Sequence, residues 1–420
     1  MQDQIILKMR NKNTNNNKDR QRSRSTFQIV QCVLIITIIL VFLLQIHIIS
    51  LDTLENVGKS LPMQDSVQIL TSILKNEDYD ITDTSSNQIL HGDFEKLLTL
   101  AFADKKGTPK VDQALLNSLP PLSDFKSLYG EKPTIIGLDT CKAYREKIPI
   151  ENRIIGPAGL FNTGTNLMAQ LLDHNCMFQV AKQNKKKGGM KWQVPWGKHT
   201  PASWRLKNIA VAGGKGVVQT DVLPVVTIKD PYTWMTSMCR HSYSANWRHA
   251  DEHCPNLIPN EVDYSNNWFK DLEPGSSIPV NVRYNQTHKT THHSLAHLWN
   301  DWYGAYEQVT EYPRLIVRFE DFLIYPAEIT KKICECAGGV IKDETNFKVV
   351  AQSAKGSKGP HTGAEGLISA IKRYGDINVR KSAFTEKRDI DFIRENLLSD
   401  LMTKFHYTYL NEENDVITNS

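Results

Sequence analysis

The chain has 420 residues, of which 40% are hydrophobic and 23% charged, an ordinary composition for a globular protein. This length exceeds that of one small domain and suits one large α/β domain with appended segments. Residues 1–26 carry seven Lys/Arg and two Asp, a net charge of +5, so the remaining residues carry −1 of the chain's total of +4. The body of the protein therefore has no excess of basic residues, which excludes a nucleic-acid-binding footprint spread over it.

The N-terminal residues predict a cytoplasmic tail followed by one membrane-spanning helix. The tail, residues 1–26, is polar and Asn-rich, which is typical of disordered segments. In the next segment, residues 27–50, the centre Val33–Leu44 is apolar apart from Thr37, and the flanks extend it to about the length that spans a bilayer. The basic tail before this segment and Asp52 after it place the N-terminus in the cytoplasm.

A cleaved signal peptide is the alternative interpretation of residues 27–50. Cleavage would need small residues just after the apolar core, and Gln45–Ile49 contains none. We therefore expect an uncleaved signal anchor, with the rest of the chain in the secretory lumen. The one glycosylation sequon after the anchor, Asn285-Gln286-Thr287, is consistent with that compartment.

Six of the seven cysteines follow the predicted anchor, an even number that could pair in an oxidising lumen. Cys239 and Cys254 are spaced to close a loop, whereas Cys334 and Cys336 are too close in sequence to form an easy pair. The sequence leaves the full connectivity open. The six are Cys141, Cys176, Cys239, Cys254, Cys334 and Cys336.

Residues 51–133 predict a stem, and residues 134–420 a luminal domain. The stem is rich in Asp, Asn, Ser and Thr, and prolines interrupt it. Its short apolar patches, Val67–Leu74 and Leu97–Phe102, predict isolated helices.

From residue 134 onward, strand-like apolar runs alternate with helical stretches. This alternation predicts an α/β fold, with a P-loop-like parallel sheet flanked by helices. In such a sheet a ligand lies at the carboxyl ends of the strands. The predicted strands are Ile154–Ala158, Val222–Ile228 and Arg314–Phe319, and the predicted helices are Asn166–His174, Tyr232–Arg240, Thr291–Thr310, Pro326–Ala337 and Lys387–Phe405.

The most informative stretch runs from Ile154 to Leu167. An apolar strand leads through a turn of small polar residues into a helix whose Leu167, Leu171 and Leu172 share one face. A Gly/Thr turn at a helix start presents backbone N–H groups and hydroxyls to an anion, so we interpret it as a phosphate cradle. It lacks the Lys of a Walker A loop, and by itself it would also suit an ordinary strand–helix connection. The cradle residues are Asn162, Thr163, Gly164, Thr165 and Asn166.

A second landmark is the strand end at Lys229, which is followed by Asp230-Pro231 and a helix containing Ser237. A strand-end cation and a hydroxyl eight residues later can both reach one phosphate. The alternative is a surface lysine beside a helix-capping Asp230.

A third landmark, Arg318–Phe322 before Pro326, predicts an architectural role, because its acidic pair can cap turns or pair with strand-end cations.

Together these three stretches resemble the family of sulfotransferases that use 3′-phosphoadenosine 5′-phosphosulfate (PAPS). Residues 162–166 are similar to the family's K-x-G-T-like turn, which binds the 5′-phosphosulfate. Lys229 and Ser237 match the spacing of the strand-end Arg and the Ser that bind the 3′-phosphate. Residues 318–322 look like the family's late strand, often written R-Y-E-D-L. The resemblance covers roughly residues 150–410, and the predicted anchor and stem match the Golgi branch of the family.

Two positions depart from the family pattern. Asn162 stands where Lys or Arg is usual, so the cation that stabilises the leaving phosphate must come from elsewhere. Lys229 replaces Arg, which keeps the charge but loses bidentate geometry.

Residues 191–201 supply candidates for the missing groups, because they are similar to the K-x-H-x-P stretch of the cytosolic branch. There the His is the general base, so the resemblance implies His199 as base and Lys198 or Lys191 as the cation near the bridging oxygen. The spacing is not identical, because Lys198 and His199 are adjacent. Two tryptophans of this stretch could stack on the adenine or a sugar ring, or belong to the core: Trp192 and Trp196.

The family's third phosphate-binding piece is a late basic loop that contains Gly. The resemblance implies Lys355 and Lys358 for this role, with Lys372-Arg373 as a second candidate, although such segments are also typical of solvated loops.

Several histidines and one cysteine have spacings that could suit zinc, but no C-x-x-C or H-E-x-x-H frame supports a metal site. They are His249, His253, Cys254, His288, His292, His293 and His297.

We therefore expect a single-pass type II Golgi membrane protein whose residues 134–420 form a sulfotransferase domain. The resemblance implies PAPS as co-substrate, no metal, and a hydroxyl or amine acceptor on a glycan. The near-neutral charge of the body predicts no nucleic-acid partner. A luminal glycosyltransferase is one alternative, with Asp78-Tyr79-Asp80 or Asp389-Ile390-Asp391 as its metal-binding motif. A catalytically silent, membrane-anchored carbohydrate-binding protein is the other, and Asn162 is its best argument.

Overall fold

The computed structural model describes residues 94–102, 111–178, 189–207, 216–250, 252–265, 269–352, 366–382, 384 and 386–410. All of them belong to the second of the chain's two structural units, residues 83–420. The predicted tail, the predicted anchor at residues 27–50 and the stem up to residue 93 lie outside the described residues. No helix in the described part of the chain is both long and apolar enough to cross a bilayer.

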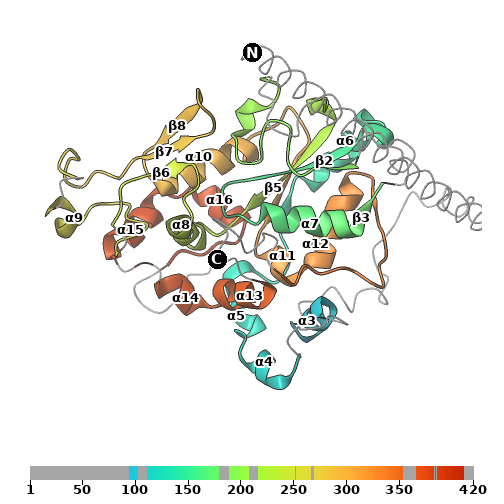
Figure 1. Ribbon diagram of the computed structural model, residues 1–420, viewed down its shortest axis with the longest axis horizontal. Coiled ribbons are helices and arrows are strands. Elements are labelled where there is room, and N and C mark those ends of the chain that lie inside the picture. The colour runs from blue at the N-terminus through green and yellow to red at the C-terminus, as the bar shows by residue number, and fades with distance from the viewer. Residues whose placement is uncertain are drawn as a thin grey trace, which may run out of the picture. The chain divides into compact units, whose positions relative to one another are not determined.

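A five-stranded sheet forms the centre of this unit (Figure 1). Its order is β1 (Ile135–Ile136), β9 (Leu315–Arg318), β5 (Val222–Ile228), β2 (Ile154–Gly159) and β4 (Gly189–Met190). Strands β9, β5, β2 and β4 run parallel, and β1 pairs antiparallel with β9 at the edge. Every residue of β2, β5 and β9 is buried, as expected when helices cover both faces of a parallel sheet. The three predicted strands and the mixed α/β class are therefore confirmed.

Two groups of helices flank the sheet. Helix α12 (Pro326–Cys336) packs on α7 (Thr165–Asn175) and α6 (Cys141–Lys147), and α10 (Leu295–Glu307) packs on α8 (Pro231–Arg240), α15 (Lys387–Asn396) and α16 (Ser399–Lys404). In Figure 1, α8, α10, α15 and α16 lie to the left of β5, whereas α7 and α12 lie below β2.

The other elements are shorter. They are α3 (Phe94–Phe102), α4 (Gln113–Asn117), α5 (Leu122–Tyr129), β3 (Cys176–Met177), β6 (Ala245–Asn246), α9 (Glu261–Ser265), β7 (Val280–Arg283), β8 (Lys289–His292), α11 (Asp321–Ile324), β10 (Val340–Ile341), α13 (Leu367–Gly375), α14 (Ile377–Ser382), and 3-10 turns at Leu138–Thr140, Ile150–Asn152, Ala202–Trp204 and Gln219–Asp221. Strand β10 pairs with β3, and β6, β7 and β8 form an antiparallel sheet.

Two predicted helices differ from the structure. The helix expected over Thr291–Thr310 begins only after Ser294, whose hydroxyl accepts the N–H of His297 and so caps α10. The helix expected over Lys387–Phe405 is broken into α15 and α16. Asn300 of α10 occupies the break: its amide donates to the carbonyl of Asn396, and its Oδ1 accepts the N–H of Leu398. A tertiary contact thus satisfies backbone groups that a continuous helix would have paired internally.

Three disulfides tie the domain together. Cys239 and Cys254 pair, as the sequence predicted. Cys334 and Cys336 do not pair with each other: they lie in α12 and bond to Cys176 and Cys141 respectively. The end of α12 is thereby linked covalently to β3 and to the start of α6.

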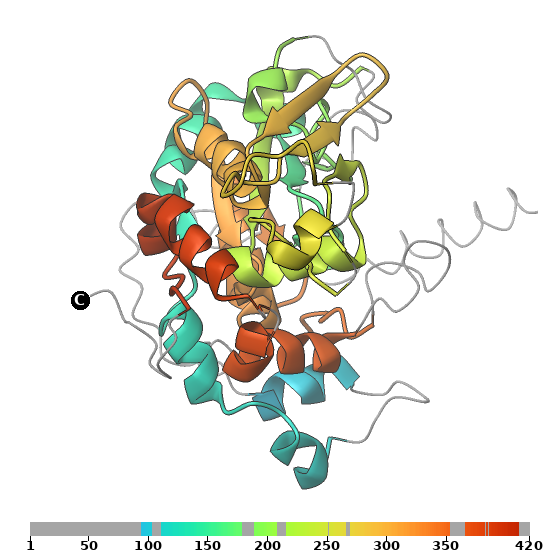
Figure 2. The ribbon, with the colours of Figure 1, turned by 90° about the vertical axis from the view of Figure 1, so that its left-hand side faces the viewer.

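Part of the predicted stem packs into the core of this unit. Helix α3 confirms the helix expected at Leu97–Phe102, but its Leu98 and Ala101 are completely buried, so the helix is not isolated. Helix α5 packs on α13, as both views show (Figures 1 and 2). The hydroxyl of Tyr129 donates to the carbonyl of Tyr374 at 2.7 Å, which joins these two helices.

Candidate functional site

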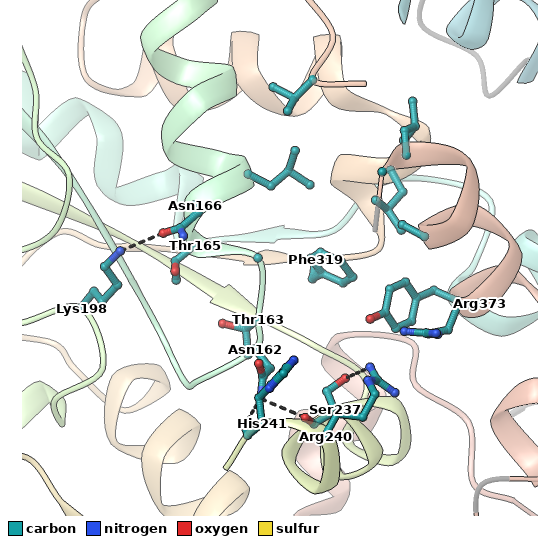
Figure 3. A pocket seen from close by; sticks show the side chains of 18 of the residues that line it. Asn162, Thr163, Thr165, Asn166, Lys198, Ser237, Arg240, His241, Phe319 and Arg373 are labelled. Carbon is teal, nitrogen blue, oxygen red and sulfur yellow. Dashed lines mark hydrogen bonds between the residues drawn. The ribbon is translucent and has the colours of Figure 1, made fainter. Parts of the chain in front are cut away.

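A pocket of about 420 Å³ lies where the segments after β2, β5 and β9 meet (Figure 3). Its wall includes the turn after β2, the side of α8, Phe319 just after β9, and α13. The pocket is therefore at the carboxyl ends of the parallel strands, the position where α/β sheets bind ligands.

The five residues of the predicted phosphate cradle all line this pocket. Gly164 has a φ of +76° at the N-cap of α7, and an added Cβ would lie 2.3 Å from the Phe319 ring. Only glycine fits this close approach in a left-handed conformation. Thr163 is buried, and its hydroxyl donates to the carbonyl of Leu160 at 2.7 Å, which closes the turn. Thr165 and Asn166 lie in the first turn of α7, where the helix dipole favours an anion.

Asn162 connects the cradle to α8. Its φ is +62°, a left-handed conformation that Asn adopts more readily than Lys or Arg. Its amide donates to the carbonyls of Ser237 at 3.1 Å and His241 at 2.8 Å, at the C-terminal end of α8. The residue that departs from the family pattern therefore joins two walls of the pocket.

Lys198 brings a cation to the start of α7. Its ammonium donates to Asn166 Oδ1 at 2.9 Å (Figure 3). The same ammonium lies 3.8 Å from the centre of the Trp192 ring. The N–H of Gly159 donates to the carbonyl of Lys198 at 2.8 Å, which attaches this segment to the end of β2. Lys198 lines the pocket, and Lys191 is not among its lining residues.

His199 lines the pocket in a defined tautomer. Its Nδ1 lies 2.7 Å from the carbonyl oxygen of Gly159. A carbonyl can only accept, so Nδ1 carries the hydrogen, and the basic lone pair of the neutral ring is on Nε2. The ring contacts Phe161, and the carbonyl of His199 accepts the indole N–H of Trp302 at 3.1 Å.

The two tryptophans near His199 differ in position. Trp192 lines the pocket and is 53% exposed. Trp196 is completely buried, and its indole N–H donates to the hydroxyl of Tyr306 at 3.0 Å, so it belongs to the core.

Lys229 and Ser237 are in contact, as their spacing predicted. The Lys229 ammonium donates to Ser237 Oγ at 2.8 Å and lies 4.0 Å from the centre of the Tyr374 ring. Lys229 is only 1% exposed and is not among the pocket-lining residues, whereas Ser237 and Tyr374 are. Burial lowers the pKa of Lys229. The lysine therefore lies behind the pocket wall and supports it.

Two arginines reach the pocket at this end, namely Arg240 of α8 and Arg373 of α13 (Figure 3). The Arg240 guanidinium donates to Ser237 Oγ at 3.1 Å. Arg240 was not predicted as a site residue from the sequence. Its position three residues after Ser237 in α8 could have indicated it, because this spacing puts both side chains on one face of the helix. Arg373 belongs to the second candidate for the late basic segment. The first candidate, Lys355 and Lys358, lies outside the described residues.

The polar ends of the pocket share an apolar wall. Phe319 lies between the cradle and Arg373 in Figure 3, and five aliphatic residues also line the pocket. They are Leu167, Leu323, Val350, Leu367 and Ala370.

The acidic residues after β9 have the architectural role that the sequence predicted. Asp321 pairs with Arg318 at 2.6 Å, and both are buried. Glu320 accepts the N–H of Asp230 and the hydroxyl of Tyr407, each at 3.1 Å. Burial, and then the negative charge of Asp230, raise the pKa of Glu320 to about 7.

Asp230 also caps α8, because its Oδ1 accepts the N–H of Thr233 at 3.0 Å. Its other oxygen binds Arg380 of α14 at 2.8 Å, and both side chains are buried. The capping interpretation of Asp230 is confirmed, whereas Lys229 beside it is buried and is not a surface lysine.

The residues considered for metal binding have structural partners. Cys254 is in a disulfide, and His253 lies between Asp263 at 2.9 Å and Asp389 at 3.1 Å. Asp389 also accepts the N–H groups of Leu257 and Ile258. Across the described ranges, no group of three or more His, Cys, Asp or Glu is arranged to hold a metal ion. The first candidate metal motif of a glycosyltransferase, at residues 78–80, lies outside those ranges.

Comparisons of the chain with models of known protein families and with curated proteins give no match. The residues and geometry of the pocket are therefore the basis for any statement about its function.

Proposed function

We propose that this protein is a PAPS-dependent sulfotransferase. The observation that carries the proposal is that one pocket has two separate polar ends with an apolar wall between them. One end has Lys198 at the start of α7, and the other has Arg240 and Arg373. PAPS has the matching shape, with a 5′-phosphosulfate and a 3′-phosphate on opposite sides of an adenosine. A ligand with one phosphate would leave one cationic end of the pocket without an anion.

The cradle of residues 162–166 and Lys198 suit the 5′-phosphosulfate, because they combine a helix N-terminus with an ammonium group. Ser237, Arg240 and Arg373 suit the 3′-phosphate, because guanidinium groups form charge-assisted hydrogen bonds to phosphate. Lys229 supports Ser237 from behind.

In the proposed reaction, the acceptor oxygen or nitrogen attacks the sulfur in line with the bond to the bridging oxygen. The new bond to sulfur forms as the bond from sulfur to the 5′-phosphate breaks, and adenosine 3′,5′-bisphosphate (PAP) leaves. The acceptor proton passes to Nε2 of His199, the atom that the tautomer leaves basic. Lys198 stabilises the negative charge that develops on the bridging oxygen.

The strand–turn–helix cradle supports a P-loop-like description of the sheet. The three disulfides favour an oxidising compartment. Together with the anchor predicted at residues 27–50, they support a type II protein of the Golgi membrane, with a glycan as acceptor.

Binding of PAP to the detergent-solubilised full chain, measured by calorimetry, tests the proposal. Arg240→Ala and Arg373→Ala should each weaken PAP binding about tenfold or more, because each removes a charge-assisted hydrogen bond. Arg248→Ala is the matched control, since Arg248 pairs with Asp271 on the surface, outside the pocket. In a transfer assay with radiolabelled PAPS, His199→Ala should lose transfer and keep PAP binding.

The same measurements separate the alternatives. PAP binding without transfer to any acceptor would support the silent carbohydrate-binding protein. No PAP binding, with Mn²⁺-dependent binding of a nucleotide sugar instead, would support the glycosyltransferase.

A further inference from the structure

Two exposed aromatic side chains lie on the rim of the pocket. In the described part of the chain, nine large hydrophobic side chains are exposed, and only two of these are aromatic, Trp192 at 53% and Tyr243 at 40%. Both line the pocket. Aromatic rings are costly to expose, so their coincidence at one site indicates that they meet a ligand there.

Tyr243 is held in an unfavourable backbone conformation, with a φ of +52°. Residues other than Gly, Asn and Asp rarely adopt this region, and such outliers persist where the surroundings enforce them, often at functional sites. The Tyr243 ring is stacked on Phe161, with centres 5.6 Å apart and planes 14° apart. Phe161 in turn contacts His199 at 4.7 Å between ring centres. The exposed ring is therefore one side chain away from the proposed base.

Trp192 is in direct contact with Lys198, the other group that the proposed reaction uses. The Lys198 ammonium lies over its ring at 3.8 Å and also donates to Asn166 in the cradle. Trp192 thus contacts Lys198 directly, and Tyr243 is connected to His199 through the Phe161 ring.

We propose that Trp192 and Tyr243 form the acceptor subsite and bind the flat C–H face of a pyranose ring. This inference rests on the proposed sulfotransferase function and assigns its acceptor to specific side chains. A pyranose has one apolar face that can stack on an aromatic ring, while its edge presents a hydroxyl to Nε2 of His199. A small apolar acceptor would instead need an enclosed apolar cavity, and these rings are exposed beside the polar Lys198 and His241.

The test uses the solubilised full chain, radiolabelled PAPS and three acceptor classes: N-acetyllactosamine and chondroitin as glycans, a tyrosine-containing acidic peptide, and 4-nitrophenol. Transfer to a glycan is expected. Trp192→Ala and Tyr243→Ala should each raise the acceptor KM about tenfold, with the dissociation constant of PAP unchanged. Trp192→Phe and Tyr243→Phe should retain most of the affinity, because the ring remains.

Leu206→Ala is the matched control. Leu206 is 57% exposed and has a φ of +65°, like Tyr243, but it is not among the pocket-lining residues. Its substitution should leave the acceptor KM within about twofold.

Each other outcome counts against the inference. Transfer only to the peptide or to 4-nitrophenol, or alanine variants with an unchanged KM for the glycan, would overturn the pyranose subsite and leave the sulfotransferase proposal standing. PAP binding without transfer to any acceptor would overturn the subsite as well. Failure of the wild-type protein to bind PAP would instead reject the proposed function itself, and the binding measurement on the same sample distinguishes these cases.

Discussion

At the scale of single residues, the turn after β2 depends on Asn162. A longer cation at this position would face two obstacles in this protein. The left-handed backbone is unfavourable for it, and the carbonyls of Ser237 and His241 would lose the short amide that now binds both. The position is thus used to join the cradle to α8, and Lys198 brings the cation from another segment.

Asn162→Lys is therefore expected to destabilise the folded state, even though it restores the residue usual in the sulfotransferase family. The loss of two hydrogen bonds and the backbone strain together predict a decrease of about 2–4 kcal/mol in the free energy of unfolding. PAP binding should weaken in parallel. Denaturant unfolding and calorimetry measure the two effects.

Asn162→Gly separates the two causes, because glycine accepts the left-handed φ and lacks the amide. It should lose less stability than Asn162→Lys. Equal or tighter PAP binding by Asn162→Lys would contradict this account of the turn.

At the scale of elements, the ends of β5 and β9 are joined by buried charges and hydrogen bonds. The N–H of Phe319 donates to the carbonyl of Ile228, and Glu320 accepts the N–H of Asp230, so the chain just after each strand is fixed to its neighbour. Arg380 of α14 neutralises Asp230. This arrangement holds the Phe319 ring against Gly164 of the cradle. The acidic pair after β9 therefore helps to position one wall of the pocket.

The raised pKa of Glu320 predicts that stability falls as the pH rises. Burial, and then the charge of Asp230, raise this pKa from 4.5 to about 7, so between these values the folded state binds more protons than the unfolded state. The free energy of unfolding should therefore decrease from about pH 4.5 to about pH 7, by up to about 3 kcal/mol from this group. Urea unfolding at several pH values, with disulfides intact, measures the slope.

Glu320→Gln should flatten this part of the profile, because Gln is neutral and can still accept the N–H of Asp230. An unchanged slope in the variant would show that other groups cause the pH dependence. His253 is one such group, because it also has a shifted pKa. Burial lowers that pKa, but the hydrogen bonds and charges of Asp389 and Asp263 outweigh this, and the net shift is upward.

At the scale of the whole molecule, the disulfides and one exposed sequon bear on the predicted luminal location. The disulfides join segments 195 and 158 residues apart, from α6 and β3 to α12. The sequon at Asn285 lies in the exposed turn between β7 and β8. There Asn285 Oδ1 accepts the backbone N–H of Thr287 at 2.9 Å and its hydroxyl at 3.2 Å.

If the domain is luminal, Asn285 should carry an N-linked glycan, because the turn is accessible and the sequon is complete. Treatment of the cell-expressed chain with a glycosidase that removes N-linked glycans should lower its apparent mass in one step. Asn285→Gln and Thr287→Ala should abolish the step, and Thr287→Ser should keep it, since Ser retains the hydroxyl. A wild-type chain that does not respond to the glycosidase would contradict the predicted topology.

Features that depend on neighbouring residues could be predicted from the amino-acid sequence. The strands ending near Gly159 and Ile228, the Gly/Thr turn and the Lys229–Ser237 spacing were all predicted, because hydrophobic periodicity and turn chemistry are local properties. The Cys239–Cys254 pair spans only 15 residues and was predicted for the same reason.

Contacts between segments far apart in the chain could not be predicted and are known from the folded structure. It brings Arg373 of α13 beside Arg240 of α8, turns Asn162 toward the end of α8, and places Asn300 in the break between α15 and α16. It also selects Cys141 and Cys176 as the partners of the two α12 cysteines. These contacts depend on the packing of whole elements against one another, a long-range free-energy balance that spacing along the chain does not encode.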